Sequence, residues 1–332
     1  MLSFPMSVIR FSLRRLALVM LLAVPPAAVA DESFSNPINP AADPWMAYAD
    51  GAYRLATTQG TRVRLWSAPT VAGLKNAEPI TIWEKGSGVW APEFHRLQGP
   101  RGLRWYCYFT KTDGEDQRHR MFVMESKTGR IEGPYAEPVQ IRTDPKDEFY
   151  AIDGSVFETG GKLYFLWAGH PGHRLFISAM KDPFTLAGSR VLIPASGFGC
   201  EEVREGPFIL IHQDRVFLTY SACDTGKPDY KVGYLWMKKG DDPMKVASWT
   251  QRPEPLLQRN DAANVYGPGH HSFFKSADGK EDWIAYHAKT TAEYTYKGRS
   301  TRVQKIEWDA EGFPKPIVPV SLETPLKEPG RK

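Results

Sequence analysis

Cysteine is scarce in this sequence. Only three cysteines occur in 332 residues, and this small, odd number cannot define a disulfide framework. A small disulfide-stapled domain is therefore excluded, and a large apolar core must hold the fold together. Cys107 stands between two tyrosines and is expected to be a buried apolar side chain. The sequence leaves open whether Cys200 pairs with Cys223.

Long amphipathic helices and an excess of one charge are also missing. The first 30 residues carry three of the 42 basic residues and none of the 38 acidic ones, so the remainder is nearly neutral. A near-neutral chain does not attract nucleic acid or an anionic membrane surface, and we expect neither as a partner. No set of His, Cys, Asp and Glu has the spacing of a protein metal site.

The first 30 residues have the pattern of a secretory signal peptide. Three arginines precede a short apolar run at 16–24, and small residues follow at 28–30. The run is too short to span a bilayer. The adjacent Pro-Pro pair would break a helix, although an uncleaved membrane anchor is the alternative. We predict cleavage near Ala30 and a secreted or periplasmic protein made of residues 31–332.

Short strands rich in aromatic residues fill the rest of the chain, separated by Gly, Pro, Asp and Asn, which is the pattern of an all-β protein. Five times an anchor residue precedes an apolar run, a turn and an aromatic strand. The anchors lie 48 to 64 residues apart and are Asp43, Ala91, Asp153, Glu205 and Gly269. This period is typical of propeller blades. We predict a single-domain, five-bladed β-propeller over residues 31–332, closed by a strand within 301–314 that returns to the first blade.

Three of the five anchors are carboxylates, and a propeller brings equivalent positions to its central axis. Cleavage of a glycosidic bond needs one carboxylic acid to protonate the leaving oxygen and one carboxylate to activate water. A nearby anion raises the pKa of the acid, because two close negative charges are unfavourable. Asp43, Asp153 and Glu205 therefore offer a base, an acid and a group that tunes the acid. Taken singly, each also begins a common turn dipeptide, which is the structural alternative.

Five segments occur in an order that resembles glycoside hydrolase family 43, whose members are five-bladed propellers acting on arabinose- and xylose-containing polymers. These segments are Ala42 to Pro44, Val89 to His95, Ile152 to Ser155, Arg204 to Pro207 and Tyr266 to Phe273. The resemblance implies that Asp43 is the general base, Glu205 the general acid, and Asp153 the residue that orients the acid and raises its pKa. It also implies inversion of anomeric configuration, for which the two carboxyl groups stand roughly 6.5–9.5 Å apart.

Four further residues are expected around the sugar. Trp90 and Trp45 lie beside anchors, where an indole face can stack on a sugar ring, and packing within a blade is the alternative. Ala91 is the small anchor expected in the pocket wall. The family commonly places an arginine from the region before the closing strand in the sugar pocket. Arg299 and Arg302 both match this description, and we favour Arg299.

His270 follows the last anchor and should face the central channel. The resemblance implies that this histidine lies near a bound Ca²⁺ or Na⁺ whose shell is completed by water. A neutral histidine in the core is the alternative, and His271 is the weaker candidate by register. No organic cofactor is expected, because hydrolysis of an acetal needs only water and two carboxyl groups.

The predicted activity is removal of α-L-arabinofuranosyl residues from plant-type arabinan or arabinoxylan. The preference for arabinose rests on the resemblance of segments 89–95 and 267–272 to arabinofuranosidase branches of the family. It also rests on a length with no room for the additional β-sandwich of many xylosidases. A β-xylosidase and an endo-arabinanase of the same family are alternatives. So is a non-catalytic propeller that binds only carbohydrate or only a protein partner.

Overall fold

Strands joined by tight turns make up the fold, as the aromatic runs predict. The computed structural model of the protein describes residues 1–2 and 33–331, so the predicted signal peptide lies outside it except for its first two residues. The helices of the described part are short 3-10 turns: η1 (Ala72–Asn76), η2 (Asp116–Arg118), η3 (Val246–Ser248) and η4 (Asp261–Ala263). The prediction of an all-β protein is confirmed. In the described residues, no helix is long and apolar enough to cross a membrane.

Antiparallel sheets follow one another along the chain as five blades. The first blade contains β2 (Trp45–Ala49), β3 (Ala52–Ala56), β4 (Gly60–Ala68) and the start of β5 (Ile80–Gly99). The second contains the rest of β5, β6 (Gly102–Thr112), β7 (Arg120–Glu125) and β8 (Val139–Ile141). The third contains β9 (Ala151–Thr159), β10 (Lys162–Gly169), β11 (Arg174–Asp182), β12 (Thr185–Leu186) and β13 (Val191–Leu192).

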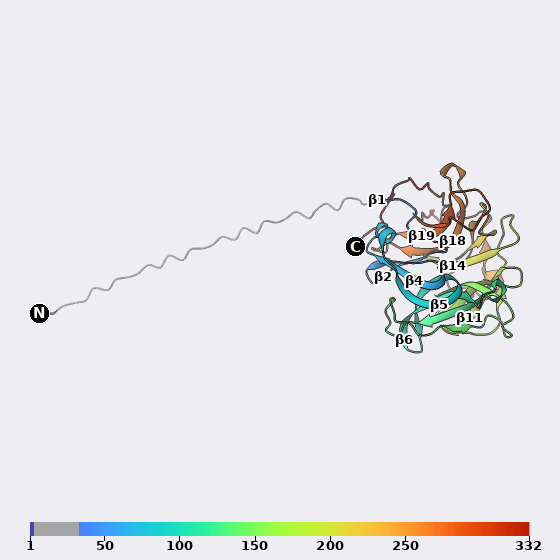
Figure 1. Ribbon diagram of the computed structural model, residues 1–332, viewed down its shortest axis with the longest axis horizontal. Coiled ribbons are helices and arrows are strands. Elements are labelled where there is room, and N and C mark those ends of the chain that lie inside the picture. Colours follow the sequence, from blue (N-terminus) through green and yellow to red (C-terminus); the bar gives the residue numbers. More distant parts are fainter. Residues whose placement is uncertain (3–32, 332) are drawn as a thin grey trace. The chain divides into compact units, whose positions relative to one another are not determined.

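The remaining two blades complete the predicted five. The fourth contains β14 (Arg204–His212), β15 (Arg215–Ala222), β16 (Lys231–Lys238) and β17 (Thr250–Gln251). The fifth contains β18 (Tyr266–Lys275), β19 (Asp282–Lys289) and β20 (Ser300–Lys305). The labelled strands run from blue through green and yellow to orange around the body, so that β19 comes back beside β2 (Figure 1). The five-bladed propeller is confirmed.

Apolar side chains fill the spaces between blades. One cluster joins the second and third blades, another the third and fourth, and another the first and fifth. The largest cluster spans the first and second and also the fourth and fifth blades, and it contains Cys107, which is fully buried as expected. Cys200 and Cys223 form a disulfide with a Cα–Cα distance of 4.9 Å, which settles the pairing that the sequence left open.

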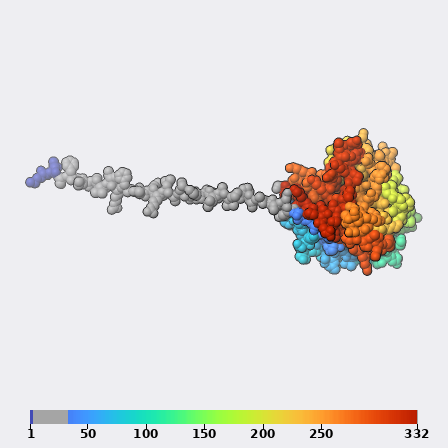
Figure 2. All heavy atoms as spheres, turned by 90° about the horizontal axis from the view of Figure 1, so that it is seen from above, coloured from blue at the N-terminus to red at the C-terminus, as the bar shows by residue number. Residues whose placement is uncertain are grey.

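The ring closes differently from the prediction. Residues 300–305 form the third strand of the fifth blade and do not cross to the first. The N-terminal segment instead comes to the free edge of β20, where Ile38 donates its N–H to Thr301 and Thr301 donates to Asn39, both at 2.9 Å. Next to this seam, β1 (Ser33–Phe34) pairs with β21 (Leu326–Lys327). Figure 2 accordingly shows blue N-terminal atoms of the described chain against red C-terminal ones.

Every innermost strand begins with the same backbone distortion. One residue in each blade has a left-handed φ: Asp43 (60°), Ala91 (42°), Asp153 (56°), Gly206 (53°) and His270 (41°). Strand pairing shifts at this point in the second, third, fourth and fifth blades, which identifies the feature as a β-bulge. The equivalent residues of the last two blades are therefore Gly206 and His270. The sequence repeat had placed them one residue earlier.

Candidate active site

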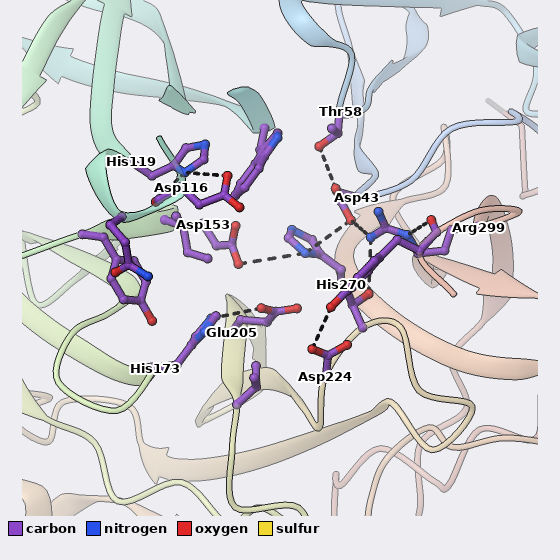
Figure 3. A pocket seen from close by; sticks show the side chains of 17 residues that line it. Asp43, Thr58, Asp116, His119, Asp153, His173, Glu205, Asp224, His270 and Arg299 are labelled. Atoms are coloured by element: carbon purple, nitrogen blue, oxygen red, sulfur yellow. Dashed lines mark hydrogen bonds and ion pairs between the residues drawn. The ribbon is translucent and has the colours of Figure 1, made fainter. Parts of the chain in front are cut away.

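The bulges surround a pocket of about 570 Å³, a size typical of small-molecule sites. Because a bulge re-aims its side chain, it turns each anchor toward this common space. Figure 3 shows Asp43, Asp153 and Glu205 on three sides of the pocket with His270 between them. The three predicted carboxylates therefore meet, as the repeat predicts. The pocket is lined by Asp43, Thr58, Trp90, Asp116, Gln117, His119, Tyr150, Ile152, Asp153, His173, Val203, Glu205, Asp224, Thr225, His270, Tyr296 and Arg299.

Asp43 is held as an anion by its neighbours. Its Oδ2 accepts a hydrogen bond of 2.7 Å from the Thr58 hydroxyl. Its Oδ1 lies 3.4 Å from Arg299 and 3.5 Å from His270 Nδ1. Burial by itself would raise the pKa of Asp43, but the charges of His270 and Arg299 and the contact with His287 bring this pKa well below its usual range. A carboxylate that stays ionised in this way is suited to act as a base.

Asp153 has the opposite tendency. Burial raises its pKa to about 7, and the nearby charges of Glu205 and Asp43 raise it further against the opposing effect of His270. Its Oδ2 accepts a hydrogen bond of 3.1 Å from the backbone N–H of Gly206, the residue after Glu205. Asp153 is thus tied to the strand that carries the predicted acid.

Glu205 lies between a phenol and an imidazole. Tyr230 donates to its Oε1 at 2.7 Å, and His173 Nε2 lies 3.1 Å from its Oε2. Burial raises the pKa of Glu205, but His173 and the further hydrogen bond bring it below its usual value, while the pKa of His173 is raised in return. Because Asp153 and Glu205 repel each other's charge, they titrate as a pair, and His173 places a further proton beside Glu205.

His270 contacts carboxylates on two sides. Its Nδ1 lies 3.5 Å from Asp43 and 4.0 Å from Asp153. Burial lowers its pKa, but these carboxylates and Glu205 raise it above the usual value, so the ring fits the role of a cation. Among the described residues, no group of three or more His, Cys, Asp and Glu is arranged to hold a metal ion. Protein side chains alone therefore do not fit a metal centre. The Ca²⁺ or Na⁺ stays a prediction in which His270 and water would be the ligands, and His271 is buried against Thr219.

The predicted substrate contacts divide into two groups. Trp90 and Arg299 line the pocket, and the Trp90 ring stacks on His119 with the centroids 3.7 Å apart. Trp45 is only 3% exposed and packs on Phe94 in the core, so the prediction that it contacts the sugar is wrong, and blade packing explains this tryptophan.

Ala91 and the competing arginine are also buried. Ala91 is 3% exposed and acts through its backbone, since its N–H donates to the Thr58 hydroxyl at 2.9 Å. Its methyl group is not among the pocket-lining groups, which corrects the prediction of a wall residue. Arg302 is fully buried and donates to the backbone oxygen of Lys289, so Arg299 is the arginine that faces the pocket.

Sequence reasoning missed His173, Tyr230 and His287. His287 is buried, and its Nδ1 lies 3.0 Å from Asp43 Oδ1. Burial lowers the pKa of His287 to about 4, so its ring is neutral. Its position was detectable, because the second strands of the blades carry equivalent polar residues beside each bulge. His173 and Tyr230 lie in loops without a repeated pattern, so no comparable signal pointed to them.

Comparison with known proteins connects this geometry to characterised relatives. Residues 34–314 match the model of the glycosyl hydrolases family 43. An extracellular exo-α-(1→5)-L-arabinofuranosidase of Streptomyces chartreusis is 33% identical over 83% of this chain and 89% of its own length. The enzyme of the same name from Streptomyces avermitilis is 34% identical over 87% of this chain, which spans only 64% of that relative.

A solved structure gives the same result in three dimensions. The α-L-arabinofuranosidase from Lactobacillus brevis superposes with a TM-score of 0.79 at 31% identity, covering 88% of this chain and 98% of the other. A thermostable family-43 glycoside hydrolase, at 22% identity and a TM-score of 0.72, shares the fold.

Proposed function

This chain belongs to glycosyl hydrolases family 43, and from that premise we propose that it is an exo-acting, inverting α-L-arabinofuranosidase. The observation that carries the proposal is the opposite protonation of two buried carboxyl groups in one pocket. The pKa of Asp43 lies well below its usual range, and that of Asp153 is raised to about 7. Pairs of carboxyls whose environments push their pKa values apart divide the roles of base and acid. The names of the 33–34% identical relatives support arabinose as the sugar.

In the proposed mechanism, Asp43 removes a proton from a water molecule that attacks the anomeric carbon. Thr58 and Arg299 hold the carboxylate, so that one oxygen keeps a fixed direction toward the pocket. The positive charges of Arg299 and His270 keep Asp43 ionised before the attack. As Asp43 accepts the proton, Thr58 and the neutral His287 remain as uncharged neighbours.

Glu205 protonates the leaving oxygen in the same step. When the sugar displaces water from the pocket, the carboxyl groups become less solvated, and their pKa values rise. A proton held near Glu205 by the coupled Asp153 and by His173 then lies on the group that must donate it. Tyr230 and His173 fix the two oxygens of Glu205 in place.

Trp90 is proposed to stack on the sugar or on the group that it leaves. The ring is already fixed against His119, so little rotamer freedom is lost on binding. The substrate is proposed to be a plant-type arabinan or arabinoxylan oligosaccharide. The printed names of the Streptomyces relatives are those of extracellular enzymes, which supports a secreted protein.

The test is to follow hydrolysis of para-nitrophenyl α-L-arabinofuranoside by proton NMR. The β-anomer of arabinose should appear first and mutarotate later, because a single displacement inverts the configuration. First appearance of the α-anomer would contradict inversion. Cleavage of the β-xyloside alone would show a β-xylosidase, and cleavage of linear arabinan without either small substrate would show an endo-arabinanase. Binding of arabino-oligosaccharides without hydrolysis of any of them would show a carbohydrate-binding propeller.

A matched pair of variants tests the acid. Glu205→Gln keeps the size and removes the proton, and hydrolysis should fall by about 10²–10⁴-fold. Glu201→Gln, in the exposed segment before the same strand, should retain wild-type activity. Hydrolysis at the wild-type rate by Glu205→Gln would exclude the proposed mechanism.

A further inference from the structure

The five bulges share a hydrogen bond that links neighbouring blades. In four of them, the N–H of the left-handed residue donates to a side chain of the preceding blade, at the position that faces the residue before the next bulge. These four hydrogen bonds are Ala91 to Thr58 (2.9 Å), Asp153 to Thr110 (3.2 Å), His270 to Ser221 (2.8 Å) and Asp43 to His287 Nδ1 (3.3 Å). A buried N–H has to be paired, so each of these side chains secures a bulge.

The third blade breaks this pattern at Ala168. Ala168 pairs with Ile152 in the same register in which Ser221 pairs with Glu205 and His287 with Gly269. Alanine has no acceptor, and Ala168 is fully buried. The N–H that an acceptor here would receive belongs to Gly206, and this N–H instead donates to the carboxylate of Asp153 at 3.1 Å.

We propose that Ala168 is a positioning residue for catalysis, because its lack of an acceptor reserves the Gly206 N–H for Asp153. The bond joins Asp153 to the residue next to Glu205 and so fixes the distance between the two coupled carboxyl groups. A serine or threonine at this position would satisfy the amide and release Asp153. The inference rests on the proposed function, since it concerns how Asp153 supports Glu205 as the acid.

The variant Ala168→Ser tests this directly. Its hydroxyl should accept from Gly206, as Ser221 accepts from His270, and Asp153 should lose its amide donor. Loss of one such hydrogen bond should lower kcat/KM about tenfold for arabinobiose, whose sugar leaving group needs protonation. The dinitrophenyl arabinofuranoside should be nearly unaffected, because its leaving group needs no acid. Ala168→Cys has nearly the same volume with a weak acceptor and should stay close to wild type for both substrates.

The outcomes separate this inference from the proposed function. A wild-type protein that cleaves no arabinofuranoside contradicts the proposed function. An active wild type with a folded Ala168→Ser variant that keeps the wild-type ratio between the two substrates overturns the role of Ala168. Equal losses for both substrates, or the same change in Ala168→Cys, overturn it as well, because they indicate disturbed packing.

A stability measurement tests the same bond without activity. Asp153→Ala leaves the Gly206 N–H unpaired, and adding Ala168→Ser should then raise Tm by about 2 °C or more. The same serine in the wild-type background should give no increase in Tm, because the amide is already paired. An equal effect of the serine in both backgrounds would show that Gly206 and Ala168 are not coupled through Asp153.

Discussion

Asp43 in the first blade and Asp153 in the third occupy equivalent bulges with nearly the same φ, 60° and 56°, yet their chemistry is opposite. Asp43 is surrounded by Thr58, Arg299 and histidines and has a strongly lowered pKa. Asp153 receives one amide hydrogen bond, lies near Glu205, and has a pKa raised to about 7. The repeated backbone delivers a side chain to the axis, and the surrounding side chains determine its charge. A repeat therefore predicts where a catalytic group lies better than which role it takes.

The largest expected effect comes from removing the ionised member of this comparison. Asp43→Asn keeps the shape of the side chain and removes the base, so kcat should fall by about 10³-fold for good and poor leaving groups alike. Steady-state kinetics with the dinitrophenyl arabinofuranoside and arabinobiose measures both. Asp50→Asn, in the exposed turn after β2, is the matched control and should behave as wild type. Retained activity in Asp43→Asn would remove the contrast between the two aspartates.

A smaller and selective effect is expected for Asp153→Asn. The variant keeps an acceptor for Gly206 but no longer raises the pKa of Glu205, so kcat/KM for arabinobiose should fall by about 10²-fold. The loss with the dinitrophenyl substrate should be under about fivefold, since that leaving group departs as a stable anion. Equal losses with the two substrates would give Asp153 the same role as Asp43.

The pH profile should show the two aspartates as separate limbs. The pKa of Asp153 is raised to about 7, so the coupled pair loses a proton as the pH rises through 7, and kcat/KM should then fall. The pKa of Asp43 is lowered, so on the acid side activity should persist to below about pH 4. Measuring kcat/KM from pH 3 to 9 tests both limbs. Asp153→Asn should move the upper limb, and an unmoved limb would assign it to another group.

The smallest effect should come from two equivalent threonines. Thr58→Val and Thr110→Val each leave a bulge N–H unpaired and should each lower stability by about 1–3 kcal/mol in urea unfolding. Only Thr58 also donates to Asp43, so only Thr58→Val should lower kcat, by about fivefold. A similar loss of kcat in Thr110→Val would show that bulge stability, not the hydroxyl on Asp43, controls the rate.

Much of the fold and the central carboxylates could be predicted from the sequence, because aromatic strands and turn residues repeat with a constant period. The register at the last two bulges could not, since Glu205 resembles the other acidic anchors although Gly206 has the equivalent backbone. Trp45 was misplaced because aromatic residues beside an anchor serve packing and sugar binding equally well. His173 approaches Glu205 only through tertiary structure.

The seam between the N-terminal segment and β20 sets the order in which the chain can become complete. Asn36 exchanges hydrogen bonds with Val303, a residue 267 positions later in the chain. The first part of the propeller to be synthesised must therefore wait for nearly the last before it finds its partner. Contacts of such long range form slowly, and until they form the edge of β20 is open to pairing with other chains. Ring closure is thus the step at which folding and aggregation compete in this protein.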